Sequence, residues 1–133
     1  MPSCTYDCDD TSIITKHFEN DFGCENTKHD LVVDLINDYT IIRSKESYDN
    51  QVSGTCHPDI NFSLFDLVIG KQSSGNWNDT IIYNLTRTCP EDELILTVDI
   101  IQSAATIPDN VVYHAIIPKL GDEEAINVKI NLK

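Results

Sequence analysis

The stretch LILTVDI at residues 94–100 decides the fold class, because apolar residues stand at every second position. Successive side chains of a β-strand point to opposite faces, so Leu94, Leu96, Val98 and Ile100 are expected on one buried face of a strand. The same alternation recurs at 126–132 and at 60–69, the latter with one slip near Phe65 of the kind that a β-bulge produces. These segments predict half-buried strands.

Further apolar runs occupy residues 31–36, 39–43, 81–86 and 111–117, separated by segments rich in Asn, Asp, Gly and Ser. Short strands with such turns, and almost no helical periodicity, predict an all-β fold, either an antiparallel β-sandwich or an open barrel. At most one short helix is expected, with Ser44 as its N-cap and running towards Val52. Residues 1–29 are polar and broken and are expected to form an irregular, partly ordered N-terminal tether before a single β domain at 30–133.

The charge of the chain limits its partners. The 133 residues include 22 Asp and Glu but only 9 Lys and Arg, which gives a net charge of −13. Nucleic-acid binding needs basic side chains to neutralise phosphates, so no nucleic-acid partner is expected. No apolar stretch approaches the roughly 18 residues of a membrane span, so membrane contact is expected only through a lipid anchor.

The five cysteines indicate the compartment. None forms a C-x-x-C pair, and an odd count predicts two disulfides plus one cysteine with another role, in an oxidising compartment. Ser3 before Cys4 fits the end of a bacterial lipoprotein processing site, which would make Cys4 the lipidated residue. The alternative is that Cys4 is a disulfide partner or a free thiol. The expected location is extracytoplasmic, as a lipoprotein of the outer membrane, periplasm or cell surface.

One disulfide follows from an expected hairpin. If the strands at 60–69 and 80–88 pair around a loop near Gly75, then Cys56 and Cys89 lie together at the open end of that hairpin. Opposed backbones there would meet the Cα spacing of about 5.5 Å that a disulfide needs. The sequence therefore predicts a Cys56–Cys89 bond, with Cys24 paired to Cys8 or Cys4.

Two segments carry a family resemblance, INFS at 60–63 leading into LVIGKQSSGNW at 67–77, and YHAIIPK at 113–119. They resemble the PrcB-like protease-complex accessory domains and small lipoproteins of Bacteroidetes-type bacteria with a related pattern. That family has a "G-x-x-P-T-G-G-Y" loop. In this chain Gly70 and Gly75 take glycine positions and Trp77 takes the aromatic one.

The resemblance implies an extracytoplasmic β domain without known catalysis, found with or next to proteases. The loop is also similar to the "N-P-T-T-G-(Y/F)" loop of chagasin-type cysteine-protease inhibitors, although this chain lacks the Pro-Thr of both patterns. The partner-binding residues expected from it are Gly70, Ser73, Ser74, Gly75, Asn76 and Trp77.

Trp77 is the only tryptophan and lies in a turn-rich segment between two asparagines. A large rigid aromatic on a loop can anchor a protein interface or stack on a sugar. Alternatively, its ring folds back and caps the end of the core. Gly70 and Gly75 are expected to allow the loop its backbone conformation.

No catalytic or metal-binding motif stands out. Cys56 and His57 are neighbours that would point to opposite faces of a strand, and His114 sits in an apolar strand where a hydrogen-bonded, buried role is expected. The acidic clusters at 7–10, 91–93 and 122–124 lack the pattern of a calcium loop. No enzyme activity, metal or cofactor is therefore expected.

These features predict a non-enzymatic, exported binding module of the bacterial cell envelope, a lipoprotein that contacts or inhibits a protease through the 70–80 loop. The alternative is a glycan-binding or structural surface lipoprotein of unknown ligand.

Overall fold

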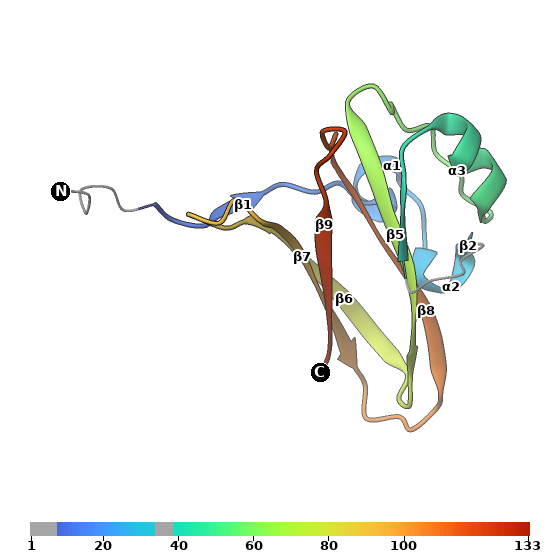
Figure 1. Cartoon of the computed structure of the whole chain (residues 1–133). Helices are drawn as coiled ribbons and strands as arrows, with labels where there is room; N and C mark the ends of the chain where they lie inside the picture. Colours follow the sequence, from blue (N-terminus) through green and yellow to red (C-terminus); the bar gives the residue numbers. More distant parts are fainter. Residues whose placement is uncertain (1–7, 34–38) are drawn as a thin grey trace.

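The computed structural model describes residues 8–33 and 39–133 (Figure 1). Its three helices are short: α1 (Phe18–Phe22), α2 (Thr27–Asp30) and α3 (Lys45–Gln51). The strands are β1 (Thr11–Ile13), β2 (Val32–Val33), β3 (Tyr39–Ile42), β4 (Val52–Ser53), β5 (Phe65–Ser74), β6 (Asn78–Arg87), β7 (Leu94–Gln102), β8 (Asp109–Pro118) and β9 (Ile126–Leu132). The predicted all-β fold is confirmed, with three short helices in place of one.

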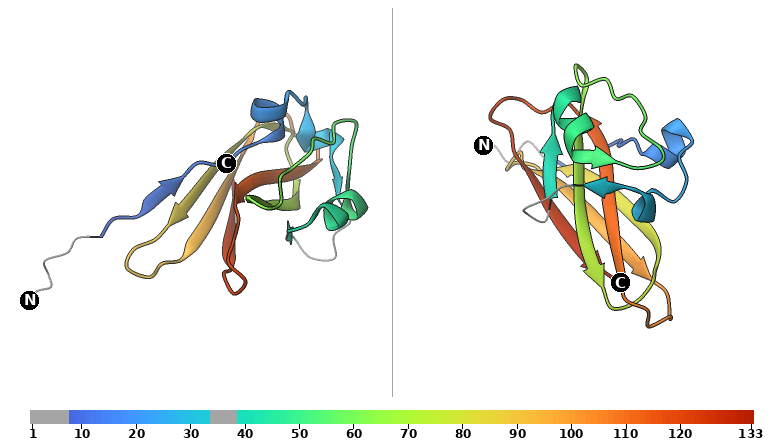
Figure 2. Two further views of the ribbon diagram at one scale, coloured as in Figure 1. Left: turned by 90° about the horizontal axis from the view of Figure 1, so that it is seen from above. Right: turned by 90° about the vertical axis from the view of Figure 1, so that its right-hand side faces the viewer.

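Two sheets make the sandwich. The outer sheet has the strand order β1-β6-β7-β9, and the central sheet has the order β3-β5-β8 (Figure 2). Neighbouring strands are antiparallel except β7 and β9, which run parallel. The pair β2-β4 forms a separate two-stranded sheet beside the central one. The later part of the strand predicted at 31–36 lies outside the described residues, as does the turn predicted at 37–38.

The outer sheet has one buried face. In β7 the side chains of Leu94, Leu96, Val98 and Ile100 are buried and pack against the central sheet, while the residues between them are half-exposed. This is the alternation that the sequence of residues 94–100 predicts.

The central sheet is covered on both faces. Val68 of β5 packs into the core shared with the outer sheet, whereas Leu67 and Ile69 pack into a second core under the N-terminal helices. That second core contains Phe18 of α1 and Tyr48 of α3, both fully buried. Strands covered on both sides read as unbroken apolar runs, and LVI at 67–69 and VVYHAII at 111–117 are such runs.

The strand predicted at 60–69 begins only at Phe65. The Asn61 carbonyl accepts hydrogen bonds from the N–H groups of Leu64 and Phe65, so residues 61–65 form a turn. The slip in the apolar period near Phe65 therefore marks the end of a turn and the start of β5, and the predicted β-bulge there is wrong.

The disulfides connect other partners than predicted. Cys8 bonds Cys89 and Cys24 bonds Cys56, with Cα separations of 5.5 and 5.7 Å. The predicted Cys56–Cys89 bond is wrong because β5 and β6 form no hairpin. β5 pairs with β3 and β8, and the chain then crosses to the outer sheet, where β6 pairs with β1 and β7.

The segment before residue 30, expected as a tether, supplies β1, α1 and α2. It first pairs with β6 through Ile13 and Leu85, and then moves to the central sheet, where Lys16 bridges Ile116 of β8. A single extended segment therefore passes from one sheet to the other.

Candidate functional site

The connection from β5 to β6 brings Trp77 to the place where the chain crosses between the sheets. The Trp77 N–H donates to the Ala105 carbonyl (3.0 Å), and the Ser103 N–H donates to the Trp77 carbonyl (2.8 Å). The side-chain amide of Asn76 donates to the Ser103 carbonyl (3.1 Å). Asn76 and Trp77 are thus bonded to the turn at 103–105.

Only half of the predicted binding residues lie in this connection. Gly70, Ser73 and Ser74 belong to β5 and pair with β8. Gly70 and Ser74 are buried there, and the Ser74 hydroxyl accepts a hydrogen bond from the Asn76 N–H (3.2 Å). Ser74 thus positions the loop from within the strand.

The expected role of the glycines is wrong. Neither Gly70 nor Gly75 has a positive φ, the region that favours glycine. A Cβ added at Gly75 would meet no atom within 4 Å. The conformation of this loop is set by its hydrogen bonds to Ser74 and to residues 103–105.

Trp77 forms an aromatic pair with His29 of α2. The rings stack with centroids 4.6 Å apart and planes 21° apart, and Trp77 keeps 41% of its surface exposed. The His29 Nε2 lies 2.9 Å from both carboxylate oxygens of Asp109, whose side chain is only 4% exposed. The Asn78 N–H donates to the same carboxylate (3.0 Å). We call Gly75, Asn76, Trp77 and His29 the Trp77 surface.

The Asp109 carboxylate is suited to hold this pair. Burial raises the pKa of Asp109, but the hydrogen bonds from His29 and the Asn78 N–H outweigh that effect and lower the pKa overall. The carboxylate therefore stays ionised and fixes the His29 ring, on which Trp77 rests.

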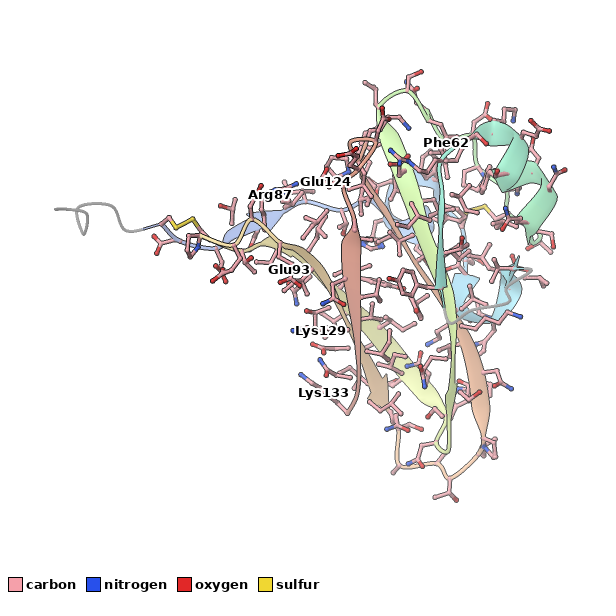
Figure 3. The ribbon with its side chains drawn as sticks, viewed as in Figure 1. Phe62, Arg87, Glu93, Glu124, Lys129 and Lys133 are labelled. Carbon is pink, nitrogen blue, oxygen red and sulfur yellow. A yellow bond between two sulfur atoms is a disulfide. The ribbon has the colours of Figure 1, made fainter. Side chains whose placement is uncertain are left out.

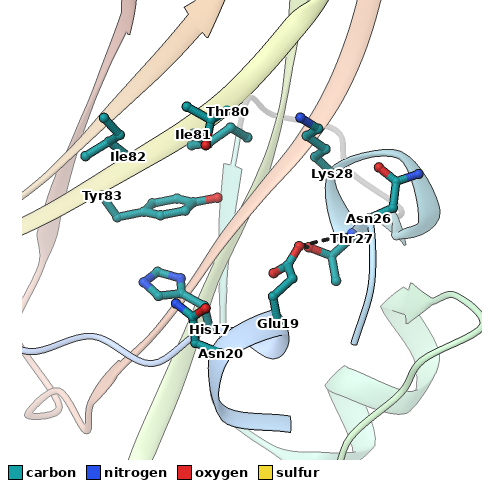
Figure 4. A pocket seen from close by; sticks show the side chains of 10 residues that line it. All are labelled: His17, Glu19, Asn20, Asn26, Thr27, Lys28, Thr80, Ile81, Ile82 and Tyr83. Carbon is teal, nitrogen blue, oxygen red and sulfur yellow. Dashed lines mark hydrogen bonds between the residues drawn. The ribbon is translucent and has the colours of Figure 1, made fainter. Parts of the chain in front are cut away.

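A pocket of about 670 Å³ is lined in part by Asn26, Thr27 and Lys28, which precede His29 in the chain (Figure 4). It opens where the N-terminal segment leaves β6 and moves to β8. Its walls come from β6 and from the segment that carries α1 and α2, through His17, Glu19, Asn20, Asn26, Thr27, Lys28, Thr80, Ile81, Ile82 and Tyr83.

Tyr83 and two histidines link the sheets beside the pocket. The rings of His17 and Tyr83 stack at 4.5 Å, and the His114 N–H donates to the Tyr83 hydroxyl (3.0 Å). The Phe18 N–H donates to the His114 Nε2 (2.9 Å), which holds the start of α1 against β8. Burial raises the pKa of Tyr83 and lowers the pKa of both histidines, that of His114 to about 4. All three rings are thus uncharged at neutral pH.

Opposite charges stand on the wall of the pocket formed by α1 and α2. Glu19 Oε2 accepts hydrogen bonds from both the N–H and the hydroxyl of Thr27. Burial raises the pKa of Glu19, but these bonds lower it overall, so Glu19 is an anion. The Lys28 ammonium donates to the carbonyls of Asp79 (2.8 Å) and Asn78 (3.3 Å) at the edge of β6.

Cys56 is bonded to Cys24 and so offers no thiolate beside His57, and His114 is buried as predicted. Residues 8–33 and 39–133 hold no group of three or more His, Cys, Asp or Glu side chains placed to bind a metal ion. Cys4, the predicted lipidation site, lies outside the described residues.

Sequence reasoning missed His29, Asp109, Glu19 and Lys28. Each lies in a helix of four or five residues or at a strand end, and their partners are up to 80 positions away along the chain. No local spacing relates such residues, so only the docking of α2 on β8 brings them together.

Comparison with protein-family models, curated proteins and solved structures gave no match for this chain. The two disulfides indicate an oxidising, extracytoplasmic environment. Within the described segments, no helix has the length and apolar character to cross a membrane.

Proposed function

We propose that this chain is a non-enzymatic, extracytoplasmic binding module that contacts a protein partner through the Trp77 surface. The observation that carries the proposal is the Trp77–His29 stack, which leaves a tryptophan partly exposed on a ring that buried Asp109 holds in place. Tryptophan is among the residues that contribute most to protein interfaces.

The Trp77 surface is ordered before any partner arrives. Hydrogen bonds hold the backbone of Trp77 on both sides, and the His29 ring restricts the indole. Binding through a fixed side chain loses less conformational entropy than binding through a mobile one. The stack also covers part of the indole, so Trp77 serves both as a packing residue and as an anchor.

A protease is the partner we propose, on the strength of the resemblance to PrcB-like domains. The location we propose is the bacterial cell envelope, with Cys4 as the lipid anchor. The loop contributes Gly75, Asn76 and Trp77 directly, Ser74 holds it from β5 by donating to the Asn76 carbonyl, and Ser73 donates to Asn110 of β8.

A glycan is the second candidate partner, because an amide side chain lies beside His29, the ring on which Trp77 stacks. The Asn26 Oδ1 accepts a hydrogen bond from the His29 Nδ1 (3.2 Å), and Asn26 also lines the pocket, together with Asn20. An aromatic ring beside an amide suits the apolar face and the hydroxyl groups of a sugar.

The experiment is an inhibition assay with the oxidised protein against a panel of papain-type and subtilisin-type proteases. Wild type is expected to inhibit one class, and Trp77→Ala to weaken inhibition at least tenfold with little change in melting temperature. Phe22→Ala is the matched control, because Phe22 is an aromatic of similar exposure (42%) on α1.

Three outcomes would count against parts of the proposal. No inhibition at micromolar concentration would exclude direct protease inhibition. Full inhibition by the Trp77→Ala variant would exclude the Trp77 surface as the site that contacts the protease. Oligosaccharide binding on a glycan array that is lost in Trp77→Ala, without protease inhibition, would favour the second candidate.

A further inference from the structure

The edge of β6 is covered along only part of its length. β1 pairs with Leu85, Thr86 and Arg87 of β6, and then its chain moves away to β8. Over residues 79–84, no described strand pairs with β6 on the side opposite β7. This open stretch is the one that lines the pocket.

The backbone groups that face away from β7 can be assigned. The Thr88 N–H donates to the Glu93 carbonyl at the end of the β6–β7 hairpin, and hydrogen-bonded pairs alternate along an antiparallel ladder. Even-numbered residues of β6 therefore bond β7, and odd-numbered ones face outward. The register shifts between Asn78 and Thr80, so this assignment holds from Thr80 onward. Ile81 and Tyr83 thus each direct an N–H and a C=O towards the pocket.

The opposite edge of the same sheet is β9, which carries charged side chains. Figure 3 shows Lys129 and Lys133 projecting from β9, with Arg87, Glu93 and Glu124 nearby. Arg87 pairs with Glu124 (2.6 Å), and Lys133 pairs with Asp99 (3.3 Å). Charged side chains on an edge strand discourage pairing with another chain. Within the open stretch of β6, residues 80–83 are the uncharged Thr, Ile, Ile and Tyr, and Ile82 is 48% exposed.

Glu19 gives the pocket next to this edge an anionic oxygen that can accept a cation, and Lys28 is the basic residue of the same lining. Glu19 is ionised, and its hydrogen bonds to Thr27 engage only Oε2. The Lys28 ammonium is held at the end of β6 by the carbonyls of Asn78 and Asp79, and the Glu19 Oε1 accepts no hydrogen bond from Thr27. The whole chain carries a net charge of −13, which attracts basic partners.

We propose that the open edge of β6 binds an extended, basic segment of the partner protein by β-strand addition. Ile81 and Tyr83 supply the backbone hydrogen bonds, and Glu19 accepts a Lys or Arg side chain that enters the pocket. In strand addition the main chain provides affinity and the pockets for alternate side chains provide specificity. This inference deepens the proposed function and rests on it for the partner's being a protein.

The test uses the full oxidised chain labelled with ¹⁵N and a capped peptide of about seven residues, long enough to span a strand. The peptide alternates Thr and Val with Lys, and its control replaces each Lys by Glu. The basic peptide at millimolar concentration is expected to protect the Ile81 and Tyr83 amides from solvent exchange. The Ile82 amide, already bonded to β7, is expected to change little.

N-methylated peptides test the geometry. Two peptides carry N-methyl groups on alternate residues, in opposite phases. In strand addition only one set of amides faces β6, so one phase is expected to abolish binding and the other to retain it. Equal binding by both, or loss of both, would overturn strand addition.

Matched variants test the charge. Glu19→Gln keeps an oxygen for Thr27 and is expected to weaken binding of the basic peptide about tenfold, as for loss of a charge-assisted hydrogen bond. Glu46→Gln, an exposed residue of α3, removes the same charge and is expected to change nothing. Equal affinity of the basic and acidic peptides would overturn the proposal.

Two further results are informative. Protection of Ile81 and Tyr83 that rises with protein concentration alone would show that a second copy occupies the edge, and would overturn the proposal. Trp77→Ala separates this inference from the proposed function. If that variant loses protease inhibition but still binds the basic peptide, both sites stand. If the wild type inhibits but the edge binds no peptide, only the inference fails.

Discussion

The two faces of the central sheet are built in different ways. One face packs against the outer sheet through alternating strand residues such as Leu96, Val98 and Ile100. The other packs against short helices and loops, where Phe18 and Tyr48 come from segments with little regular structure. The first core consists of side chains that alternate along regular strands. The second core depends on single large side chains and on the Cys24–Cys56 disulfide.

The first core serves as the scaffold, whereas the chain segment that forms the second core supplies residues of the candidate sites. The strand-built core fixes the positions of β6 and β8. The segment that forms the second core carries His29, Glu19 and Lys28, and so completes both the Trp77 surface and the pocket. Loss of the second core should therefore remove function before it removes the sandwich.

The largest expected effect is at Phe18. Phe18→Ala is expected to reduce the free energy of unfolding by about 4 kcal/mol, because a fully buried aromatic leaves a cavity between Tyr48 and His114. Urea unfolding followed by circular dichroism measures it. Phe22→Ala, on the exposed side of the same helix, is the control and should cost less than about 1 kcal/mol. Equal losses would show that the second core does not depend on Phe18.

Removing the Cys24–Cys56 bond comes next. Replacing both cysteines by Ala is expected to cost about 3–4 kcal/mol, because the bond closes a loop across the second core. Hydrogen exchange should then speed up in α1 and α2 more than in β7. The Cys8–Cys89 pair, replaced in the same way, is the control and should mainly loosen β1. A uniform increase in both variants would contradict the division into two cores.

The pH dependence should report the contact between α1 and β8. Burial lowers the pKa of His114 from its ordinary value of 6.5 to about 4, so the unfolded chain binds more protons between these values. The contribution of His114 to stability is therefore complete above about pH 6.5 and falls by on the order of 3 kcal/mol as the pH drops towards 4. Burial also lowers the pKa of His17, which acts in the same direction.

Urea unfolding at several pH values measures this slope. His114→Gln keeps an acceptor for the Phe18 N–H but does not titrate, and is expected to flatten the slope. An unchanged slope in that variant would assign the pH dependence to other groups.

The smallest effect is expected in the loop. Gly75→Ala should change the free energy of unfolding by less than about 0.5 kcal/mol, because its φ is not positive and a methyl group there meets no neighbour. Thermal unfolding measures it, with Ser74→Ala as the contrasting variant, since Ser74 is buried and hydrogen-bonded to Asn76. A larger loss of unfolding free energy for Gly75→Ala than for Ser74→Ala would show that the loop does depend on glycine at position 75.

The strands of the outer sheet could be predicted and the second core could not. Residues 94–100 and 126–132 alternate because each strand has one buried face, which leaves a periodic trace in the sequence. Phe18 and Tyr48 lie in helices of five and seven residues, too short for a helical period to be recognised. For the same reason, three helices replaced the single one expected.

The candidate site was only partly visible. Trp77 stands out as the sole tryptophan in a turn, whereas its partner His29 is 48 positions earlier, in the four-residue helix α2, and gives no local signal. The predicted Cys56–Cys89 bond failed because a turn-rich loop between two strands was assumed to join them in one sheet. A loop that crosses between sheets has the same composition.

By itself, the sequence determined the β-rich class, the oxidising compartment and the prominence of Trp77, because alternation, cysteine number and composition are local or additive properties. The tertiary structure alone decided which cysteines bond, which ring supports Trp77 and which stretch of β6 stays open. These depend on contacts between residues far apart in the chain, and their free energies are set by how whole elements pack.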